Sequence, residues 1–479
     1  MTGHRTSVRV RVMRLLASLA PIERGELITV VLLMINVFVL LTCYYVLKVV
    51  REPLILLGGG AELKAYASAG QTLLLIAVVP AFGWLSNRVS RLRLLTTIQV
   101  VFIACLLAFY ALAAARAPIG LAFYLWLGIF SVLVVSNFWS FAADLYTPER
   151  GKRLFATIGI GASIGAVLGA YVPHLLHRVM GTSALLLVAA GGLAVSIVIY
   201  RVVDHRERSH RMTRPRPTEA EGEAETAAEA AAASDRRGGF ALVIKDRYLR
   251  LLAVMLLVAT IINTTGEYVV GKMATDRSEV YAAEQAAARP VAATPDAQAA
   301  AAHDAQGDYI GAFYSSYYTI VNLLSFLLQG LVVAWLLNAL GIRRALFVMP
   351  VVVLAGWCGL LLFANLTMLR IEKTSENSLD YSLHNTLRGA LFLPTTRSAK
   401  YKAKAAIDTF FFRMGDVIAG LGIVFLLVRV AGLGIRAFAV LNVCLAMCWL
   451  VLAYRTGRMY DAMAADHLEP DARPERVAA

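Results

Sequence analysis

Twelve long runs of apolar residues occupy most of the chain between residues 27 and 455. A helix that crosses a bilayer needs about 20 predominantly apolar residues, and it bonds its own backbone groups internally. The pattern therefore predicts an all-α membrane protein with twelve transmembrane helices in two six-helix halves. The runs lie at roughly 27–50, 67–86, 95–115, 119–143, 155–175, 182–202, 249–271, 312–337, 344–364, 379–396, 405–430 and 435–454.

The tenth run is the least apolar of the twelve. It carries Asp380, His384, Asn385 and Arg388, and ionisable side chains that face lipid are costly. We therefore expect this helix to face a polar cavity inside the protein.

Polar segments set the expected domain organisation. A tract from Asp204 to Gly239 is rich first in Arg and then in Glu and Ala, which predicts a disordered or weakly helical linker. An Ala-rich insertion separates runs seven and eight and gives no indication of its function. The expected parts are an N-terminal tail (1–26), a first half (27–203), the linker (204–248), a second half (249–455) that contains the extracytoplasmic insertion (275–308), and a C-terminal tail (456–479).

The composition excludes a soluble enzyme, because 59% of the 479 residues are hydrophobic and only 16% are charged, against about 25% charged in soluble domains. The five cysteines lie in apolar runs without metal-ligand spacing, so we expect neither a metal site nor a disulfide framework. A Walker-type phosphate loop is missing from the sequence, and we expect neither ATP hydrolysis nor a cofactor.

The formal charge of +14 comes from 46 basic and 32 acidic residues. The basic residues gather in alternate connections, as in Arg88–Arg93 and Arg150–Arg153, which places both termini in the cytoplasm. Asp144 precedes the second of these clusters and is expected to act as a structural clasp. Nucleic-acid binding would need the basic residues on one surface with base-stacking partners, so the bilayer is the expected partner.

The two halves echo each other. Thr42–Lys48 (TCYYVLK) ends the first run and Thr265–Lys272 (TGEYVVGK) ends the seventh, so both place a Tyr and then a Lys on the outer half of a first helix. This arrangement resembles the parallel repeat of the major facilitator architecture, which holds substrate near mid-membrane between the halves. The turn Gly83–Arg93 resembles that superfamily's loop between helices two and three, with Asn87 in place of the usual Asp.

Ionisable and amide side chains inside the apolar runs are the candidate substrate-binding residues. Arginine and lysine in a cavity would suit an anionic solute, because both bind phosphate and carboxylate oxygens. A buried glutamate would then serve as counter-ion, salt-bridge gate or proton site. The candidates are Lys48, Arg51, Asn137, Glu267, Lys272, Arg413 and Asp416.

Structural explanations stay open for several candidates. Arg413 and Asp416 are three residues apart and could neutralise each other on one helix face. Lys48 and Arg51 could extend to the outer interface of the membrane. Glu267 is the hardest to explain in this way, because apolar residues precede it.

The fifth run contains glycines four residues apart at Gly161, Gly165 and Gly169. The stretch superficially resembles a dinucleotide fingerprint, but no predicted strand precedes it. We expect these glycines to form a smooth face for close helix packing.

Three stretches of the chain have a familiar pattern: YYVLKVVREPLIL (Tyr44–Leu56), FWSFAADLYTPERGKRLFATIGIGAS (Phe138–Ser163) and KAKAAIDTFFFRMGDVIAG (Lys402–Gly420). They resemble the first helix, the helix-four-to-five region and helix eleven of the ATP/ADP translocase (NTP/NDP exchange transporter) family. The resemblance implies nucleotide exchange and aligns the family's helix-one cation with Arg51 and its helix-seven acid with Glu267.

Two positions depart from that family's pattern. Apolar residues around Leu127 stand where nucleotide exchangers have a Glu in helix four, and Asp416 follows Gly415 where they have a Lys. An anion in place of a cation weakens the attraction for a triphosphate, while Arg413 lies one turn away.

We therefore expect a secondary transporter of the ATP/ADP translocase type, a monomer in a bacterial inner membrane that exchanges nucleotides or related anions by alternating access. Arg51, Lys48 and Arg413 would hold phosphates, and Glu267 would balance charge or gate. Two alternatives stay open. One is a proton-coupled carrier of a smaller organic anion with Glu267 as the proton site. The other is a non-transporting scaffold or sensor with the same fold.

Overall fold

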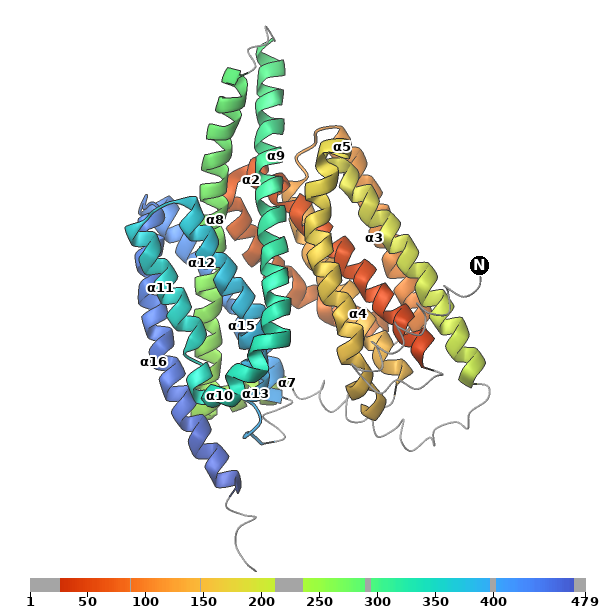
Figure 1. Cartoon of the computed structure of the whole chain (residues 1–479), viewed down its shortest axis with the longest axis vertical. Coiled ribbons are helices and arrows are strands. Elements are labelled where there is room, and N and C mark those ends of the chain that lie inside the picture. The colour runs from red at the N-terminus through yellow and green to blue at the C-terminus, as the bar shows by residue number, and fades with distance from the viewer. Residues whose placement is uncertain are drawn as a thin grey trace, which may run out of the picture. The chain divides into compact units, whose positions relative to one another are not determined.

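The computed structural model describes residues 26–86, 88–146, 148–211, 236–288, 294–396 and 402–468. Every element in those ranges is helical (Figure 1). The first elements are α2 (Leu27–Ser86), α3 (Arg91–Ala114), α4 (Gly120–Leu145) and α5 (Pro148–Arg211). The later ones, in which η marks a π-helical segment, are α7 (Arg236–Lys245), α8 (Arg247–Ala288), α9 (Pro295–Leu327), η1 (Leu328–Val332), α10 (Val333–Ala345), α11 (Val348–Leu362), α12 (Leu366–Leu379), η2 (Asp380–His384), α13 (Asn385–Ala390), α14 (Lys404–Ala406), η4 (Ile407–Phe411), α15 (Phe412–Val417), η5 (Ile418–Val430) and α16 (Ile435–Leu468).

Glycines break the two longest helices into separate segments. In α2 the break lies at Gly59 and Gly60, where Gly60 has a φ of 74° that favours glycine. In α5 it lies at Gly181, with a φ of 73°. Counted with these breaks, the helices in the described ranges are consistent with the predicted twelve-helix, all-α membrane fold, which is confirmed.

The residues group into two compact units. Unit 1 contains Met1–Gly58, Leu73–Pro215 and Ser278–Asn322, and unit 2 contains Gly59–Thr72, Arg216–Arg277 and Leu323–Ala479. The boundaries of the tails, halves and linker that we derived from the sequence stay predictions. Much of the predicted linker, Asn87, residues 289–293 and residues 397–401 lie outside the described residues.

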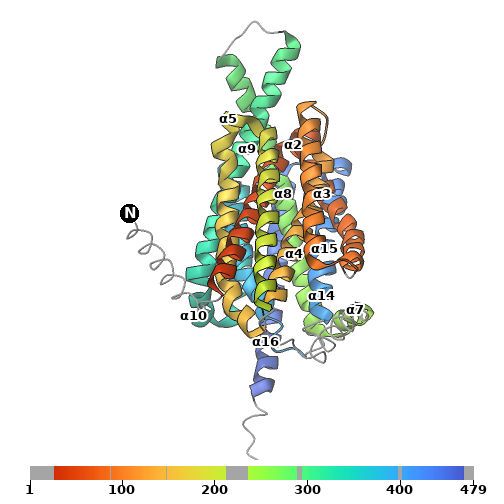
Figure 2. The ribbon, with the colours of Figure 1, turned by 90° about the vertical axis from the view of Figure 1, so that its right-hand side faces the viewer.

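The Ala-rich insertion is helical wherever the structure describes it. The C-terminal turns of α8 and the N-terminal turns of α9 form a helical hairpin in unit 1 (Figure 2). The rings of Tyr281 and Tyr309 join the two helices with centroids 5.3 Å apart.

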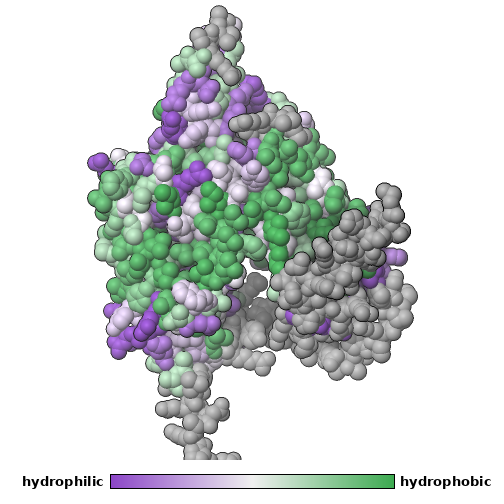
Figure 3. All heavy atoms as spheres, viewed as in Figure 1, coloured by the Kyte–Doolittle hydropathy of each residue, from purple (hydrophilic) through white to green (hydrophobic). Residues whose placement is uncertain are grey.

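Apolar side chains cover the outer faces of unit 2, as a lipid-facing surface requires. Exposed residues such as Val351 and Leu362 on α11 and Val440 and Val451 on α16 contribute to this surface. In Figure 3 hydrophobic residues cover the middle of the region of α11 and α16, and hydrophilic residues gather toward its ends. Nine helices among the described residues are long and apolar enough to cross a membrane. The chain is an integral membrane protein.

The glycine face of α5 packs against the first segment of α2 in unit 1. A Cβ at Gly161, Gly165 or Gly169 would meet the carbonyl oxygens of Met34, Phe38 and Thr42, respectively, which are also four residues apart. The expected packing role of these glycines is confirmed, because only a hydrogen at these positions lets the two backbones approach so closely.

A buried polar chain joins three helices of unit 1. Gln99 Nε2 on α3 donates to Ser196 Oγ on α5 at 3.1 Å, and Ser196 Oγ donates to Asn36 Oδ1 on α2 at 2.6 Å. All three residues are at most 3% exposed, so the pairs satisfy polar groups that water cannot reach.

Ser196→Ala should lower the stability of the purified protein, because it leaves Gln99 and Asn36 without their shared hydroxyl. We expect a loss of about 1–3 kcal/mol, measured as a lower thermal midpoint in detergent. The matched control is Ser163→Ala on the same helix, since its hydroxyl contacts the carbonyl of Gly159 one turn earlier. Equal midpoints for the two variants would contradict this expectation.

Candidate functional site

The first polar cluster of unit 1 lies on α2 and is formed by Lys48, Arg51 and Glu52. The spacing of three and four residues places these side chains on neighbouring positions of the helix surface. Arg51 forms an ion pair with Glu52, whose side chain is 0% exposed. With two cations and one anion, the cluster carries a formal charge of +1.

Tyrosines from other helices of unit 1 surround this cluster. The Lys48 ammonium lies 4.2 Å from the ring centroid of Tyr318 on α9, and the Arg51 guanidinium lies 4.5 Å from that of Tyr124 on α4. Tyr318 Oη also donates to Glu52 Oε1 at 3.0 Å. Cation–π contacts of this kind hold a cation inside a protein, and the Arg51 side chain is only 12% exposed. The guanidinium is therefore fixed inside unit 1 rather than extended along the membrane interface.

The second polar cluster belongs to unit 2 and surrounds Glu267 on α8. Lys64 Nζ, from the α2 segment that follows the glycine break, lies 3.5 Å from Glu267 Oε2. Asn377 Nδ2 on α12 donates to Glu267 Oε1 at 3.2 Å. The carboxylate is thus neutralised by one cation and held by one amide, an arrangement that suits a counter-ion or a salt-bridge gate.

One turn earlier, α12 places Lys373 beside the same region of α8. Its ammonium lies 2.9 Å from Glu376 Oε2 and donates to Asn263 Oδ1 at 3.2 Å. The stem of Lys373 crosses Gly266, where a Cβ would lie 3.0 Å from Lys373 Cδ. The absence of a side chain at Gly266 makes room for this lysine.

The polar residues of α12 were missed by the sequence analysis. The tenth run was placed at 379–396, whereas the observed helix begins at Leu366, which leaves Glu372, Lys373, Glu376 and Asn377 outside the expected span. The signal was present in Asn365, a helix-capping residue whose side chain accepts from the backbone N–H of Met368 at 2.8 Å.

The remaining candidates have mostly local partners. Asn137 is buried on α4 and donates to the Leu133 carbonyl of its own helix at 2.5 Å. Lys272 pairs with Asp276 at 3.0 Å on α8. Asp416 on α15 accepts from Thr264 Oγ1 at 2.6 Å, which brings it to the face of α8 that carries the second cluster.

The structure therefore gathers the candidates into separate groups. Lys48 and Arg51 lie together in unit 1. In unit 2, Glu267 lies on α8, and Asp416 accepts a hydrogen bond from Thr264 of the same helix. Arg413 is half-buried on α15, and no ion pair joins it to Asp416 among the described residues. The roles of all seven candidates in substrate binding stay predictions.

Asp144 forms an ion pair with Arg91 at 2.7 Å, from the end of α4 to the start of α3. Glu26 pairs with Arg153 at 2.7 Å and with Arg150 at 3.5 Å in the same unit. The expected clasp at Asp144 therefore includes Arg91, at the start of α3.

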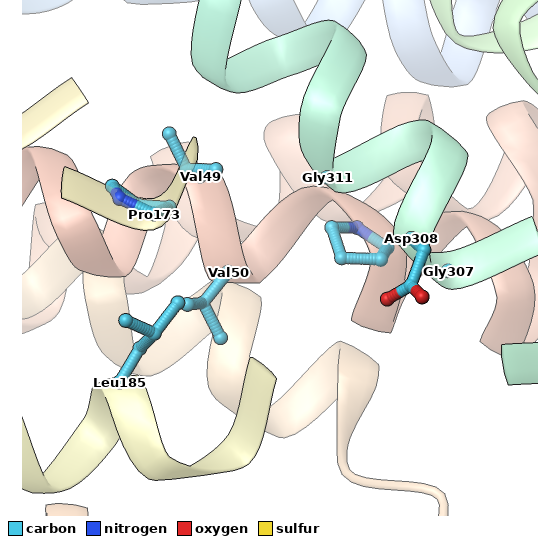
Figure 4. A pocket seen from close by; sticks show the side chains of 8 residues that line it. Val49, Val50, Pro173, Leu185, Gly307, Asp308 and Gly311 are labelled. Atoms are coloured by element: carbon cyan, nitrogen blue, oxygen red, sulfur yellow. The ribbon is translucent and has the colours of Figure 1, made fainter. Parts of the chain in front are cut away.

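A small pocket in unit 1 lies between α2, α5 and α9 (Figure 4). Val49, Val50 and Pro53 line it from α2, and Asp308 is the single charged residue among those that line it. Its remaining residues are Pro173, Leu185, Gly307 and Gly311. A mostly apolar pocket with one carboxylate has no group that would attract an anion.

The fold is shared with solved transporter structures of low sequence identity. The nucleoside transporter NupG is 13% identical, with a TM-score of 0.58 over 91% of this chain and 98% of NupG. A POT family transporter in complex with 5-aminolevulinic acid is 13% identical, with a TM-score of 0.58 over 91% and 96% of the two chains. A peptide transporter POT in complex with sulfate is 16% identical, with a TM-score of 0.52 over 90% and 95%.

A search of the curated proteins gives no match to the chain. The family model of the Major Facilitator Superfamily, in contrast, matches residues 27–371, which is more than half of the sequence. Together with the helical fold and the charged clusters inside the membrane helices, this match shows that the chain is a transporter protein that belongs to the Major Facilitator Superfamily.

Proposed function

We propose that this transporter exchanges nucleotides or closely related nucleotide anions by alternating access, in the manner of the ATP/ADP translocases that its sequence resembles. The observation that carries the proposal is the first cluster. Lys48 and Arg51 lie one helical turn apart and carry an excess positive charge inside a membrane helix.

The surroundings of this cluster match the two parts of a nucleotide. Lysine and arginine bind phosphate oxygens, and tyrosine rings stack on bases. Tyr45, Tyr124 and Tyr318 all lie against the two cations, with ring centroids 4.2–5.3 Å from the charged groups. We propose a bacterial inner membrane as the location, with both termini in the cytoplasm and a monomeric protein.

The test is counterflow of labelled nucleotide in proteoliposomes. Vesicles loaded with unlabelled ADP should accumulate labelled ATP well above vesicles without the protein. Because the phosphates carry the charge that Lys48 and Arg51 would bind, external ADP and AMP should compete, whereas adenosine should not. Counterflow with no nucleotide would refute the exchange of nucleotides. Competition by adenosine alone would refute the role of the cations.

A second candidate is a proton-coupled carrier of a smaller organic anion. It is favoured by the second cluster, where Glu267, Glu372 and Glu376 outnumber Lys64 and Lys373. In the same vesicles, uptake that needs no internal substrate and collapses with an uncoupler would favour this candidate.

A further inference from the structure

Three charged residues lie within five positions of α12 and are almost completely buried. Glu372, Lys373 and Glu376 are 3%, 0% and 1% exposed. Transferring a charge into such a place is costly unless an opposite charge accompanies it. One lysine can compensate only one of the two carboxylates, so the charges of this segment do not balance.

The contacts show which carboxylate lacks compensation. Lys373 Nζ lies 2.9 Å from Glu376 Oε2, and it also donates to Asn263 Oδ1 on α8. Both oxygens of Glu372 are buried, and among the described residues no N–H or ammonium group donates to them; the neighbouring acid is Glu376. Its side chain packs on Gly356 of α11, where a Cβ would collide with Glu372 Cγ. Glu372 is therefore the carboxyl group with the poorest partners.

The neighbouring helices, as far as the structure describes them, do not supply the missing positive charge. The α8 helix contributes Glu267, which is already paired with Lys64 from α2. The α11 helix contributes no charged residue, only Gly356 and the buried indole of Trp357.

The next turns of the tenth helix do not supply it either. Asp380 and His384 follow in η2, and His384 packs on Trp449 of α16. Arg388 on α13 pairs with Asp408 at 2.8 Å. Over Glu267, Glu372, Glu376, Asp380, Lys64 and Lys373 the formal charge is −2, so the acids of this region outnumber the cations that face them.

We propose that Glu372 is a proton-binding site and that this transporter couples the movement of its solute to the movement of a proton. The carboxylate takes a proton from water on one side of the membrane, forming one O–H bond. It returns that proton to water on the other side. While Glu372 is protonated, Lys373 pairs with Glu376. When Glu372 loses its proton, the same ammonium serves both carboxylates, which favours a different packing of α12 on α8 and α11. The proposal rests on the chain being a secondary transporter and not on the identity of its solute.

The first test observes the proton directly. Infrared spectroscopy of the purified protein in lipid should show the C=O absorption of a buried protonated carboxyl group at neutral pH, with slow exchange in D2O. Glu372→Gln should remove one carboxyl from this absorption and keep the fold, because glutamine has nearly the same shape. The matched control is Glu279→Gln at an exposed position of α8, which should leave the absorption unchanged.

Two further variants use the same measurement to test the charge balance. Glu376→Gln should also remove the absorption, because Lys373 is then free to neutralise Glu372. Lys373→Met should add one protonated carboxyl, because neither acid retains a cation. An absorption that Glu372→Gln leaves unchanged would overturn the proposal, even if Lys373→Met fails to fold.

The second test observes coupling. Proteoliposomes that contain a pH-sensitive dye should show solute-dependent proton movement with the parent protein, and the Glu372→Gln protein should lose it while it still exchanges solute. Proton movement that persists in Glu372→Gln would overturn the proposal. If no nucleotide is transported, the nucleotide proposal fails, and the infrared experiment still decides the fate of the proton site.

Discussion

Replacing Arg51 with methionine should abolish transport and also destabilise the protein. The substitution removes the guanidinium that we propose binds phosphate, and it takes the Arg51 ion pair away from Glu52, whose side chain is 0% exposed. Breaking a buried ion pair from one side costs roughly 3–5 kcal/mol. We expect counterflow to fall at least about 100-fold, together with a clear drop in the thermal midpoint measured in detergent.

A double variant separates the two effects. Arg51→Met with Glu52→Gln removes both charges, so the fold should recover most of its stability while transport stays lost. Arg116→Met, at an exposed arginine that follows α3, should match the parent in both measurements. A double variant that transports at the parent rate would show that Arg51 is a structural residue and does not bind substrate.

The amount of structure that the sequence predicted depended on how strongly the apolar pattern constrained each region. Where a run is continuously apolar, as in α3 and α4, length and hydropathy sufficed to predict the helix. The glycine spacing in α5 also predicted its own packing correctly, because a four-residue repeat of glycine has one simple use in a membrane helix.

The apolar pattern predicted the wrong start for the tenth helix, which begins with the polar segment α12. The tenth run was placed from its apolar part, yet the observed helix begins at Leu366 and buries Glu372, Lys373 and Glu376 against α8 and α11. This segment is covered by other helices rather than by lipid, so its residues need not be apolar. A hydropathy window cannot distinguish such a helix from a polar loop, whereas the capping residue Asn365 marks its start.

Lys64 illustrates a second feature that the sequence did not predict, an ion pair between distant residues. It lies in the interval left between the first two runs, and only the fold carries it to Glu267, 203 positions away. The three consecutive glycines Gly58–Gly60 indicate a helix break, and this break places Lys64 in the first turn of a new segment. Its partner could not be predicted, because ion pairs between distant residues follow from packing that a single sequence does not reveal.

The departure at Leu127 has a structural explanation. Leu127 is 1% exposed and belongs to the apolar core of unit 1, beside the aromatic group that contains Phe123, Trp126 and Phe130. A glutamate at this position would be a buried charge in an apolar surrounding. If an acid at this position has a role in nucleotide exchangers, that role is either absent from this chain or carried by another residue. Glu52, in the same unit, is the buried acid that could carry it.

Replacing either of two glycines of α5 with alanine should change the stability of the protein, in opposite directions for the two positions. A methyl group at Gly165 would meet the carbonyl oxygen of Phe38 on α2, whereas nothing lies within 4 Å of a Cβ at Gly159. Gly165→Ala must push α5 away from α2, and overpacking of this kind costs about 1–3 kcal/mol. It also disturbs the hydrogen bond that Thr42 Oγ1 donates to the Gly165 carbonyl at 3.3 Å. Gly165→Leu should prevent folding altogether.

Gly159→Ala should instead stabilise the protein by about 0.5–1 kcal/mol, because alanine loses less conformational entropy than glycine inside a helix. The thermal midpoints of the two alanine variants in detergent should thus lie on opposite sides of the parent value. The sign of the difference is the decisive observation, since general helix propensity raises both midpoints and only close contact with α2 lowers one of them. If Gly165→Ala were as stable as Gly159→Ala, the backbones of α2 and α5 would be further apart than their glycine spacing implies.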